Sequence, residues 1–93
     1  MSFETDREDE SRNLLIAAFW FALGTYVEQE AKKNDQWRDQ NVGQLYAHLA
    51  HEVDEIKTNI QRGQGRYLIH NAADAVGLSL MLLAKALEQG SKQ

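Results

Sequence analysis

The feature that most constrains the fold is the run LLIAAFWFAL, residues 14–23, which is apolar in every direction around a helix. A helix that is hydrophobic on all sides is normally buried on all sides. The single core of a 93-residue chain is too small to surround such a helix. We therefore expect a helix over residues 12–33, and a second copy of the chain as the cover for its apolar surface.

Two further helices are predicted by hydrophobic periodicity and by residues that begin and end helices. Asn41 followed by Gln44 resembles a capping box, so a second helix should begin there and continue to about residue 62. Gly63 suits a C-terminal cap, and a third helix should span about residues 66–89 and end at Gly90. Apolar residues recur every three or four positions along both helices: Val42, Leu45, Leu49, Val53, Ile56 and Ile60 on the second, and Ile69, Ala72, Val76, Leu80, Leu83 and Leu87 on the third.

The predicted fold class is therefore all-α, with three helices in one protomer and a helical bundle that dimerisation completes. We expect a single helical domain over residues 11–90. The acidic residues 1–10 should form an N-terminal tail, either loose or continuing into the first turn of the helix.

Composition argues against several classes of protein. The chain has no cysteine, so it has neither a disulfide framework nor a thiolate metal site. A net charge of −4 argues against binding to nucleic-acid polymers, whose phosphates require clustered Lys and Arg. The first residues, MSFETDREDE, are acidic where a targeting segment would be basic, and no apolar run approaches the length needed to span a bilayer. We therefore expect a cytoplasmic protein without a membrane partner.

A polar patch interrupts the third helix. Asp74 is the one formally charged residue in the stretch 67–84, and Asn71 precedes it by one helical turn. The short connection before this helix predicts antiparallel packing, which brings Asn71 and Asp74 level with Glu52 and Glu55. Carboxylates crowded in a partly dry site repel each other unless a cation or protons compensate. An all-oxygen set of this kind suits Mg²⁺ or Mn²⁺ rather than zinc.

Two simpler readings of the same residues remain open. Glutamates three positions apart on a helix are common and are usually solvated. Asp74 can also be explained in a purely structural bundle, where it would pair with His48 or His70.

The two motifs together resemble a known family. EVDE at residues 52–55 and NAAD at residues 71–74 are similar to the E-x-x-E … E-x-x-D signature of the all-α nucleoside triphosphate pyrophosphohydrolases, the MazG-like superfamily. Over roughly residues 37–88 the chain looks like the short MazG-like proteins of phages and mobile gene cassettes. The resemblance implies Mg²⁺-dependent hydrolysis of a nucleoside triphosphate, often a deoxy or non-standard one, to the monophosphate and pyrophosphate. It also implies a homo-oligomer, either a dimer or a tetramer.

Carried over position by position, the resemblance makes Glu52, Glu55 and Asp74 metal ligands and catalytic groups. Asn71 stands where the family has another acid, and its amide oxygen can bind Mg²⁺ but brings no charge. The chain either works with three acids and an amide, or has become a weak enzyme or a non-catalytic nucleotide-binding or helical interaction protein. A substitute acid is a further alternative, but Asp54 lies on the far side of its helix.

Substrate-binding candidates lie outside the two motifs. Trp37 is a tryptophan in a polar connection, where its indole would either stack on a nucleobase or plug the entrance to the helix. The phosphates need positive partners, and Lys57, Arg66 and Lys85 are the candidates, with solvated surface charge as the alternative.

Overall fold

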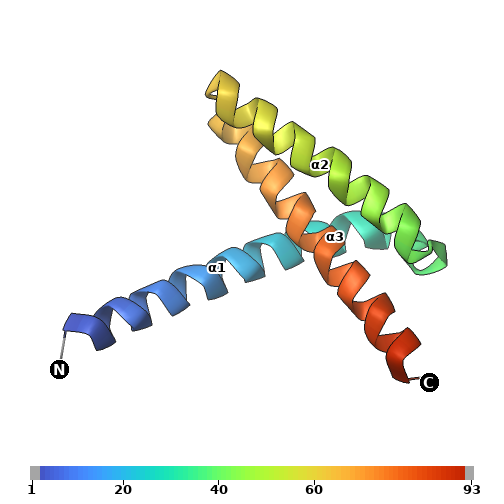
Figure 1. Ribbon diagram of the computed structural model, residues 1–93, viewed down its shortest axis with the longest axis horizontal. Coiled ribbons are helices and arrows are strands. Elements are labelled where there is room, and N and C mark those ends of the chain that lie inside the picture. The colour runs from blue at the N-terminus through green and yellow to red at the C-terminus, as the bar shows by residue number, and fades with distance from the viewer. Residues whose placement is uncertain (1–2, 92–93) are drawn as a thin grey trace.

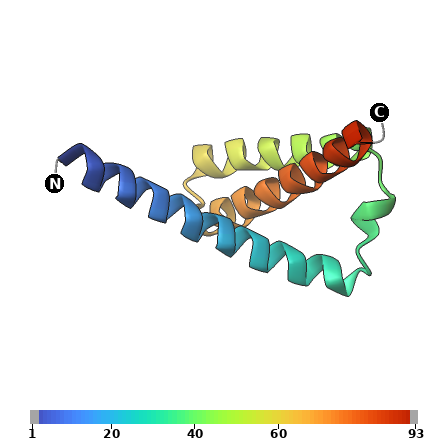
Figure 2. The same ribbon diagram turned by 90° about the horizontal axis from the view of Figure 1, so that it is seen from below.

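The computed structural model describes residues 3–91, which form three α-helices and one short 3₁₀-helix. Their bounds are α1 Phe3–Lys32, η1 Gln36–Asp39, α2 Val42–Arg62 and α3 Gly65–Ser91. The described part of the chain thus confirms the all-α prediction. α2 and α3 form an antiparallel hairpin, and α1 crosses α3 as a separate arm (Figures 1 and 2). α3 makes the main contacts with both other helices.

The two ends of α2 form as the sequence predicts. The side-chain oxygen of Asn41 accepts from the Gln44 amide at 2.8 Å, and Gln44 Oε1 accepts from the Asn41 amide at 2.9 Å, which confirms the capping box. Gly63 ends the helix in the left-handed conformation, with φ of 64°, as the predicted cap requires. The hairpin geometry is therefore set by local signals on either side of α2.

α1 begins earlier than the sequence suggests. The helix starts at Phe3, so the acidic segment is helical from there, while residues 1–2 of the expected tail lie outside the described residues. After Lys32 the chain turns at Asn34 and Asp35, both in the left-handed region that short polar residues tolerate. The turn leads into η1, where the sequence had indicated an irregular connection.

The core of one chain is small and lies where the three helices approach η1. Leu45, Leu78 and Met81 are buried at its centre. Tyr26, Trp37, Leu49 and Leu82 are partly buried against them. This core sits directly beside the predicted site residues, so it fixes how α2 and α3 face each other there.

α3 turns the stripe that carries Asn71 and Asp74 toward α2, as antiparallel packing of the two motifs predicts. Leu78 and Met81, which share a stripe with Asp74, are buried, whereas Val76 and Leu83 of the wider apolar face are 39% and 55% exposed. A wide apolar face on a helix normally turns inward. Within one chain, however, α1 and α2 pack against the narrower face that carries the polar patch, and the wider face has no partner.

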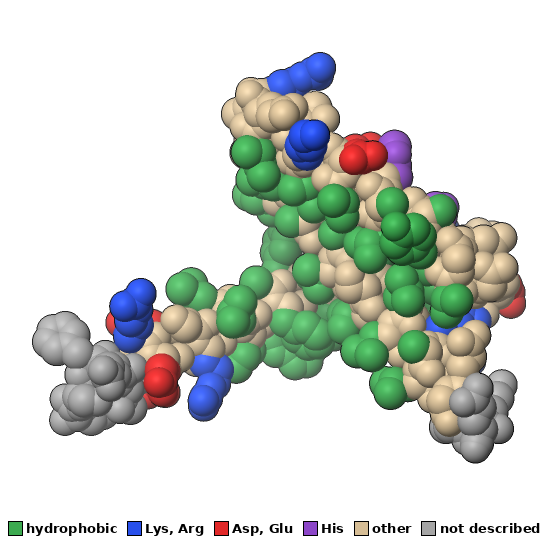
Figure 3. All heavy atoms as spheres, viewed as in Figure 1, with side chains coloured by type: hydrophobic (Ala, Val, Ile, Leu, Met, Phe, Trp, Pro, Cys, Tyr) green, Lys and Arg blue, Asp and Glu red, His purple; other side chains and the backbone are tan. Residues whose placement is uncertain are grey.

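A broad apolar surface therefore remains uncovered, and we call it the open apolar face (Figure 3). It comprises Leu14, Leu15, Ile16, Phe19, Trp20 and Phe21 on α1 and Ile69, Val76, Leu83 and Leu87 on α3, all exposed. The radius of gyration is 15.9 Å, whereas a compact chain of this length would have about 12 Å. Soluble monomers rarely expose so much contiguous apolar surface.

By length and composition alone, the segment Gly65–Gly90 of α3 could cross a membrane, with a mean hydropathy of 1.3 over its most apolar window. This differs from the expectation that no apolar run is long enough. The observation is weak on its own, because the core helix of a soluble protein meets the same criterion.

Candidate functional site

The hairpin brings Asn71 of α3 against the two glutamates of α2. One amide atom of Asn71 lies 3.3 Å from Glu52 Oε2 and 3.1 Å from Glu55 Oε2. This is the alignment of the two motifs that antiparallel packing predicts. We call Glu52, Glu55, Asn71 and Asp74 together the acidic site.

The Asn71 amide continues into a row of amides along the hairpin. In one arrangement, its Nδ2 donates to Asn59 Oδ1 at 2.7 Å, and Asn59 Nδ2 donates to Gln64 Oε1 at 3.2 Å. The Asn71 oxygen then faces the two glutamates. In the reverse arrangement, Asn71 Nδ2 donates to Glu52 and Glu55, and its oxygen faces Asn59, whose own amide must then turn as well. Oxygen and nitrogen of an amide are told apart only by such networks.

The two arrangements suit different states of the site. When the Asn71 oxygen faces Glu52 and Glu55, three oxygens converge without a donor between them, which is unfavourable unless a cation joins them. Reversing the amide places a donor between the carboxylates and relieves the repulsion. The donor set therefore fits a hard cation such as Mg²⁺, and the row of amides can adjust to its presence.

Asp74 lies one turn further along α3 and faces a hollow of about 280 Å³ together with Glu52. Lys33 also lines this hollow, which we call the Lys33 hollow. Its other lining residues are Tyr26, Gln29, His48, His51 and Leu78. Among the described residues, no three acidic or histidine side chains converge tightly enough to hold one metal ion by themselves. The structure thus joins Glu52, Glu55 and Asn71 closely and sets Asp74 beside them.

Two acids of this site, Glu52 and Asp74, hold their protons more tightly than free carboxyls. Burial raises the pKa of Glu52, and the neighbouring carboxylates of Glu55 and Asp74 raise it further. Burial also raises the pKa of Asp74; Glu55 adds to this effect, while His70 and Lys33 oppose it. The combination of partial burial and like charge is typical of sites that bind a cation or move a proton.

α1 contributes residues that the sequence reading had not assigned to the site. The ring of Tyr26 rests on Gly77 of α3, where a Cβ atom would come within 2.4 Å of Tyr26 Cγ. This close approach brings Lys33, the first residue after α1, to the hollow that Glu52 and Asp74 line. Burial and the charges of Glu30, Asp74 and Glu52 raise the pKa of Tyr26 to about 12, so its hydroxyl stays protonated beside the acids.

A second hollow adjoins the first at the level of Trp37. This Trp37 hollow, of about 240 Å³, shares Tyr26, Lys33, His48 and Leu78 with the Lys33 hollow. Its other lining residues are Glu30, Gln36, Trp37, Gln40, Leu45 and Met81. Glu52 and Asp74 therefore line one hollow, Trp37 lines the other, and Lys33 lines both.

The remaining candidates occupy different places. Lys85 donates to the backbone oxygen of Arg38 and so holds η1 against α3. Lys57 and Arg66 are exposed and lie outside the lining of the Lys33 hollow. Of the histidines, His51 contacts Glu55 at 2.9 Å, and the hydrogen bonds and ion pairs of the described residues include none between Asp74 and His48.

Tyr26 and Lys33 were missed because the first helix was judged by its apolar centre, which predicts an interface, and not by the residues near its C-terminal end. One signal was present in the sequence: Tyr26, Glu30 and Lys33 recur every three or four residues after the apolar run ends.

Comparisons with protein-family models, with curated proteins and with solved structures found no match to this chain.

Proposed function

We propose that this protein is a Mg²⁺-dependent nucleoside triphosphate pyrophosphohydrolase, which converts a nucleoside triphosphate, preferably a deoxy one, to the monophosphate and pyrophosphate. The observation that carries the proposal is the convergence of Glu52, Glu55 and Asn71 next to a hollow that also holds Asp74 and Lys33. The motif resemblance supports the same reaction. Removal of non-standard nucleotides from the cellular pool is the role that follows.

Each residue of the site has a part in this reaction. Mg²⁺, or Mn²⁺ in its place, would be held by the oxygens of Glu52, Glu55, Asn71 and Asp74 and would neutralise charge on the phosphate oxygens. Lys33 faces the same hollow and would contact the phosphate tail. A carboxylate of the site orients the water that attacks the α-phosphorus while the bond to the leaving pyrophosphate breaks.

The proposal includes a homo-oligomer, either a dimer or a tetramer. The open apolar face on α1 and α3 is the surface that a second copy would cover. Its coverage would complete the helical bundle of which one chain forms only part.

Hydrolysis of a nucleotide panel tests the reaction. Purified protein with Mg²⁺ should release pyrophosphate and a monophosphate from at least one deoxy- or ribonucleoside triphosphate. Glu52→Ala should abolish this turnover, whereas the matched control Asp54→Ala, at an exposed position of the same helix, should retain it. Equal turnover by the native chain and Glu52→Ala with every substrate would contradict the proposal.

Asn71 favours one alternative, a non-catalytic MazG-like protein that binds nucleotide or a partner helix. An amide in place of an acid lowers the charge available to bind a cation. Under this alternative the native chain turns over no substrate, and Asn71→Glu gains activity. If the native chain is active and Asn71→Glu loses activity, the amide is adapted to its site and the alternative is excluded.

A further inference from the structure

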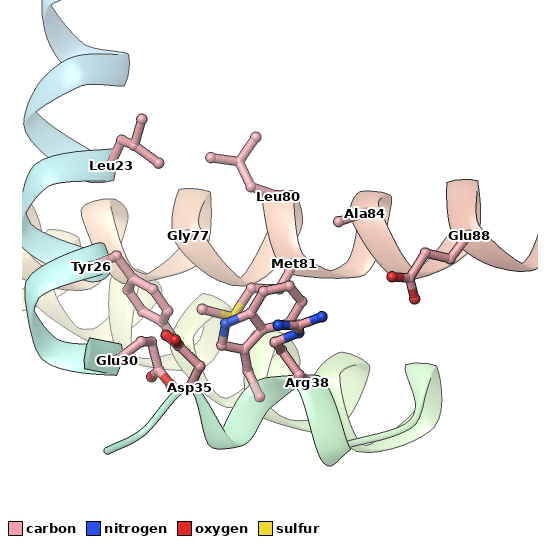
Figure 4. Close-up of a pocket in the computed structure, with 11 residues that line it drawn as sticks. Leu23, Tyr26, Glu30, Asp35, Arg38, Gly77, Leu80, Met81, Ala84 and Glu88 are labelled. Carbon is pink, nitrogen blue, oxygen red and sulfur yellow. The ribbon is translucent and has the colours of Figure 1, made fainter. Parts of the chain in front are cut away.

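Glu30 is a buried acid outside the acidic site. It is 8% exposed, near the end of α1, and extends beside the Tyr26 ring (Figure 4). Its nearest cationic partner is Lys33, at 3.9 Å, whose own side chain is largely exposed. The hydrogen bonds found among the described residues include none to the Glu30 carboxylate. Because no buried side-chain oxygen or nitrogen of the described residues lacks a partner, the carboxylate oxygens of Glu30 are accessible from the hollow rather than sealed off. A ligand that supplies donors can therefore bind them there.

The carboxylate lies where such a ligand would sit. Glu30 lines the Trp37 hollow and also a wider, more open hollow of about 480 Å³ between α1, η1 and α3 (Figure 4). The Trp37 hollow is smaller than the roughly 300–1,000 Å³ of pockets for drug-sized ligands, so it suits one flat ring system rather than a whole nucleotide. An aromatic wall from Trp37 and apolar walls from Leu45 and Met81 favour the same occupant.

The position of the hollow relates this ring to the acidic site. The Trp37 hollow and the Lys33 hollow share Tyr26 and Lys33. A base stacked on Trp37 would therefore direct its sugar and phosphates past Lys33 toward Glu52 and Asp74. The arrangement matches the order base, sugar, phosphate in a nucleotide.

The chemistry of a carboxylate restricts which base fits. A carboxylate only accepts hydrogen bonds. Guanine presents two neighbouring donors, N1–H and N2–H, which match its two oxygens. Adenine and cytosine place a ring-nitrogen acceptor next to their amino group, and thymine and uracil flank one N–H with two carbonyl oxygens, which repel a carboxylate. Gln36 and Gln40 line the same hollow and can donate to guanine O6.

We propose that Glu30 is the specificity-determining residue of the Trp37 hollow and selects a guanine-type base. The inference rests on the proposed function for the reaction that follows, whereas recognition of the base requires no turnover.

Calorimetric titration with deoxynucleoside monophosphates in the presence of Mg²⁺ tests the selection. The native chain should bind dGMP about 10- to 100-fold more tightly than dAMP, dCMP or dTMP, as expected for hydrogen bonds to a charged group. Glu30→Gln replaces one acceptor by a donor and should remove this preference. Glu28→Gln, at an exposed position of the same helix, should keep it.

A measurement on the native chain alone tests the inference even if the Glu30→Gln variant does not fold. Deoxyinosine monophosphate keeps N1–H but lacks the N2 amino group, so it should bind between dGMP and dAMP. Equal affinity for dGMP and the other three nucleotides, or an unchanged preference in folded Glu30→Gln, would overturn the inference.

The proposed reaction and the proposed recognition of guanine can be contradicted independently of each other. Hydrolysis of triphosphates without a guanine preference overturns the role of Glu30 and leaves the proposed function standing. A guanine preference in binding, with no hydrolysis of any triphosphate, supports the role of Glu30 and overturns the proposed reaction.

Discussion

At the scale of single residues, the acidic site is a place where like charges are held together in one chain. Glu52 and Glu55 face the same amide atom of Asn71, and Asp74 lines the adjoining hollow. The side chains pack there because Leu78 and Met81, on the same stripe of α3, are buried in the core. Packing of the apolar neighbours therefore sustains a cluster of acids that electrostatics alone would disperse.

This arrangement predicts a stability that falls with rising pH when no metal is present. The pKa of Glu52 is raised in the folded chain above its ordinary value of 4.5, so the folded chain binds this proton more tightly than the unfolded chain does. The stabilising effect of protonation is complete below the ordinary value and is lost as pH rises through the raised one. Glu52→Gln should consequently melt higher than the native chain at neutral pH in chelator, and the difference should vanish at acidic pH.

Thermal unfolding at several pH values, with and without Mg²⁺, measures this effect. Mg²⁺ should raise the melting temperature of the native chain and have less effect on Glu52→Gln, since a ligand of the folded state alone stabilises it. Asp54→Asn serves as the control for loss of one exposed charge. A native chain that is more stable than Glu52→Gln at neutral pH in chelator would contradict the prediction.

The site residues that helical spacing places together could be predicted from the sequence. The site residues that contacts between different helices bring together could not. The helical spacing of Glu52 with Glu55, and of Asn71 with Asp74, places each pair on one face, and the short connection at Gly63 sets the two pairs opposite each other. Glu30 lies near the end of α1, and Lys33 directly follows that helix, so both come from outside the hairpin. Their approach depends on the contact of Tyr26 with Gly77, which no periodicity reveals.

At the scale of secondary-structure elements, the contact between α1 and α3 depends on a missing side chain. Gly77 allows the Tyr26 ring to lie directly on the backbone of α3. That contact sets where α1 crosses α3 and, through the rest of α1, where Lys33 and Glu30 reach the two hollows. The crossing of α1 over α3 thus determines where these side chains lie in the site.

Gly77→Ala should therefore destabilise the chain and disturb the site together. Its Cβ would meet Tyr26 Cγ at 2.4 Å, and overpacking of this kind typically costs about 1–3 kcal/mol. Gly90→Ala, also within α3 but with no neighbouring atom within 4 Å, should be neutral or slightly stabilising. Denaturant unfolding gives both values. A Gly77→Ala variant as stable as the native chain would show that α1 can shift without cost.

The two ends of α2 were predicted because they carry local signals. The start of α1 lies earlier than predicted, at Phe3, and α3 continues through Gly90, which was expected to end it. Asn41, Gln44 and Gly63 define α2 through backbone hydrogen bonds that involve only near neighbours. The buried side of α3 depends instead on which helices lie against it. A sequence shows that a wide apolar face must be covered, but not whether the same chain or another copy covers it.

At the scale of the whole molecule, one chain is an open structure with α1 extending away from the hairpin (Figure 1). It measures 47 × 39 × 23 Å, and its open apolar face lies along both α1 and α3. Phe19 and Trp20 pack edge to face with ring centroids 5.6 Å apart, although Trp20 is 63% exposed. Aromatic residues exposed in this way are typical of the centre of a protein interface.

Self-association through this face is therefore expected. Trp20→Glu should place a charge within the interface and dissociate the oligomer, whereas Asn13→Glu, at an exposed polar position of α1, should not. Sedimentation velocity on the three proteins measures the outcome. A native chain that sediments as a monomer would contradict both the interface and the predicted dimer or tetramer.

The short connection between α2 and α3 has a consequence for how the chain folds. Contacts between residues close in sequence form early, so the hairpin should assemble before α1 reaches Gly77. Glu52, Glu55 and Asn71 all belong to the hairpin, and Lys33 does not. Formation of the hairpin would then bring Glu52 and Glu55 against Asn71 and Asp74 before Lys33 reaches them. Added salt screens the repulsion between these acids, so it should accelerate refolding more than it slows unfolding. Stopped-flow kinetics at increasing ionic strength would reveal this asymmetry, and a salt effect confined to the unfolding rate would contradict it.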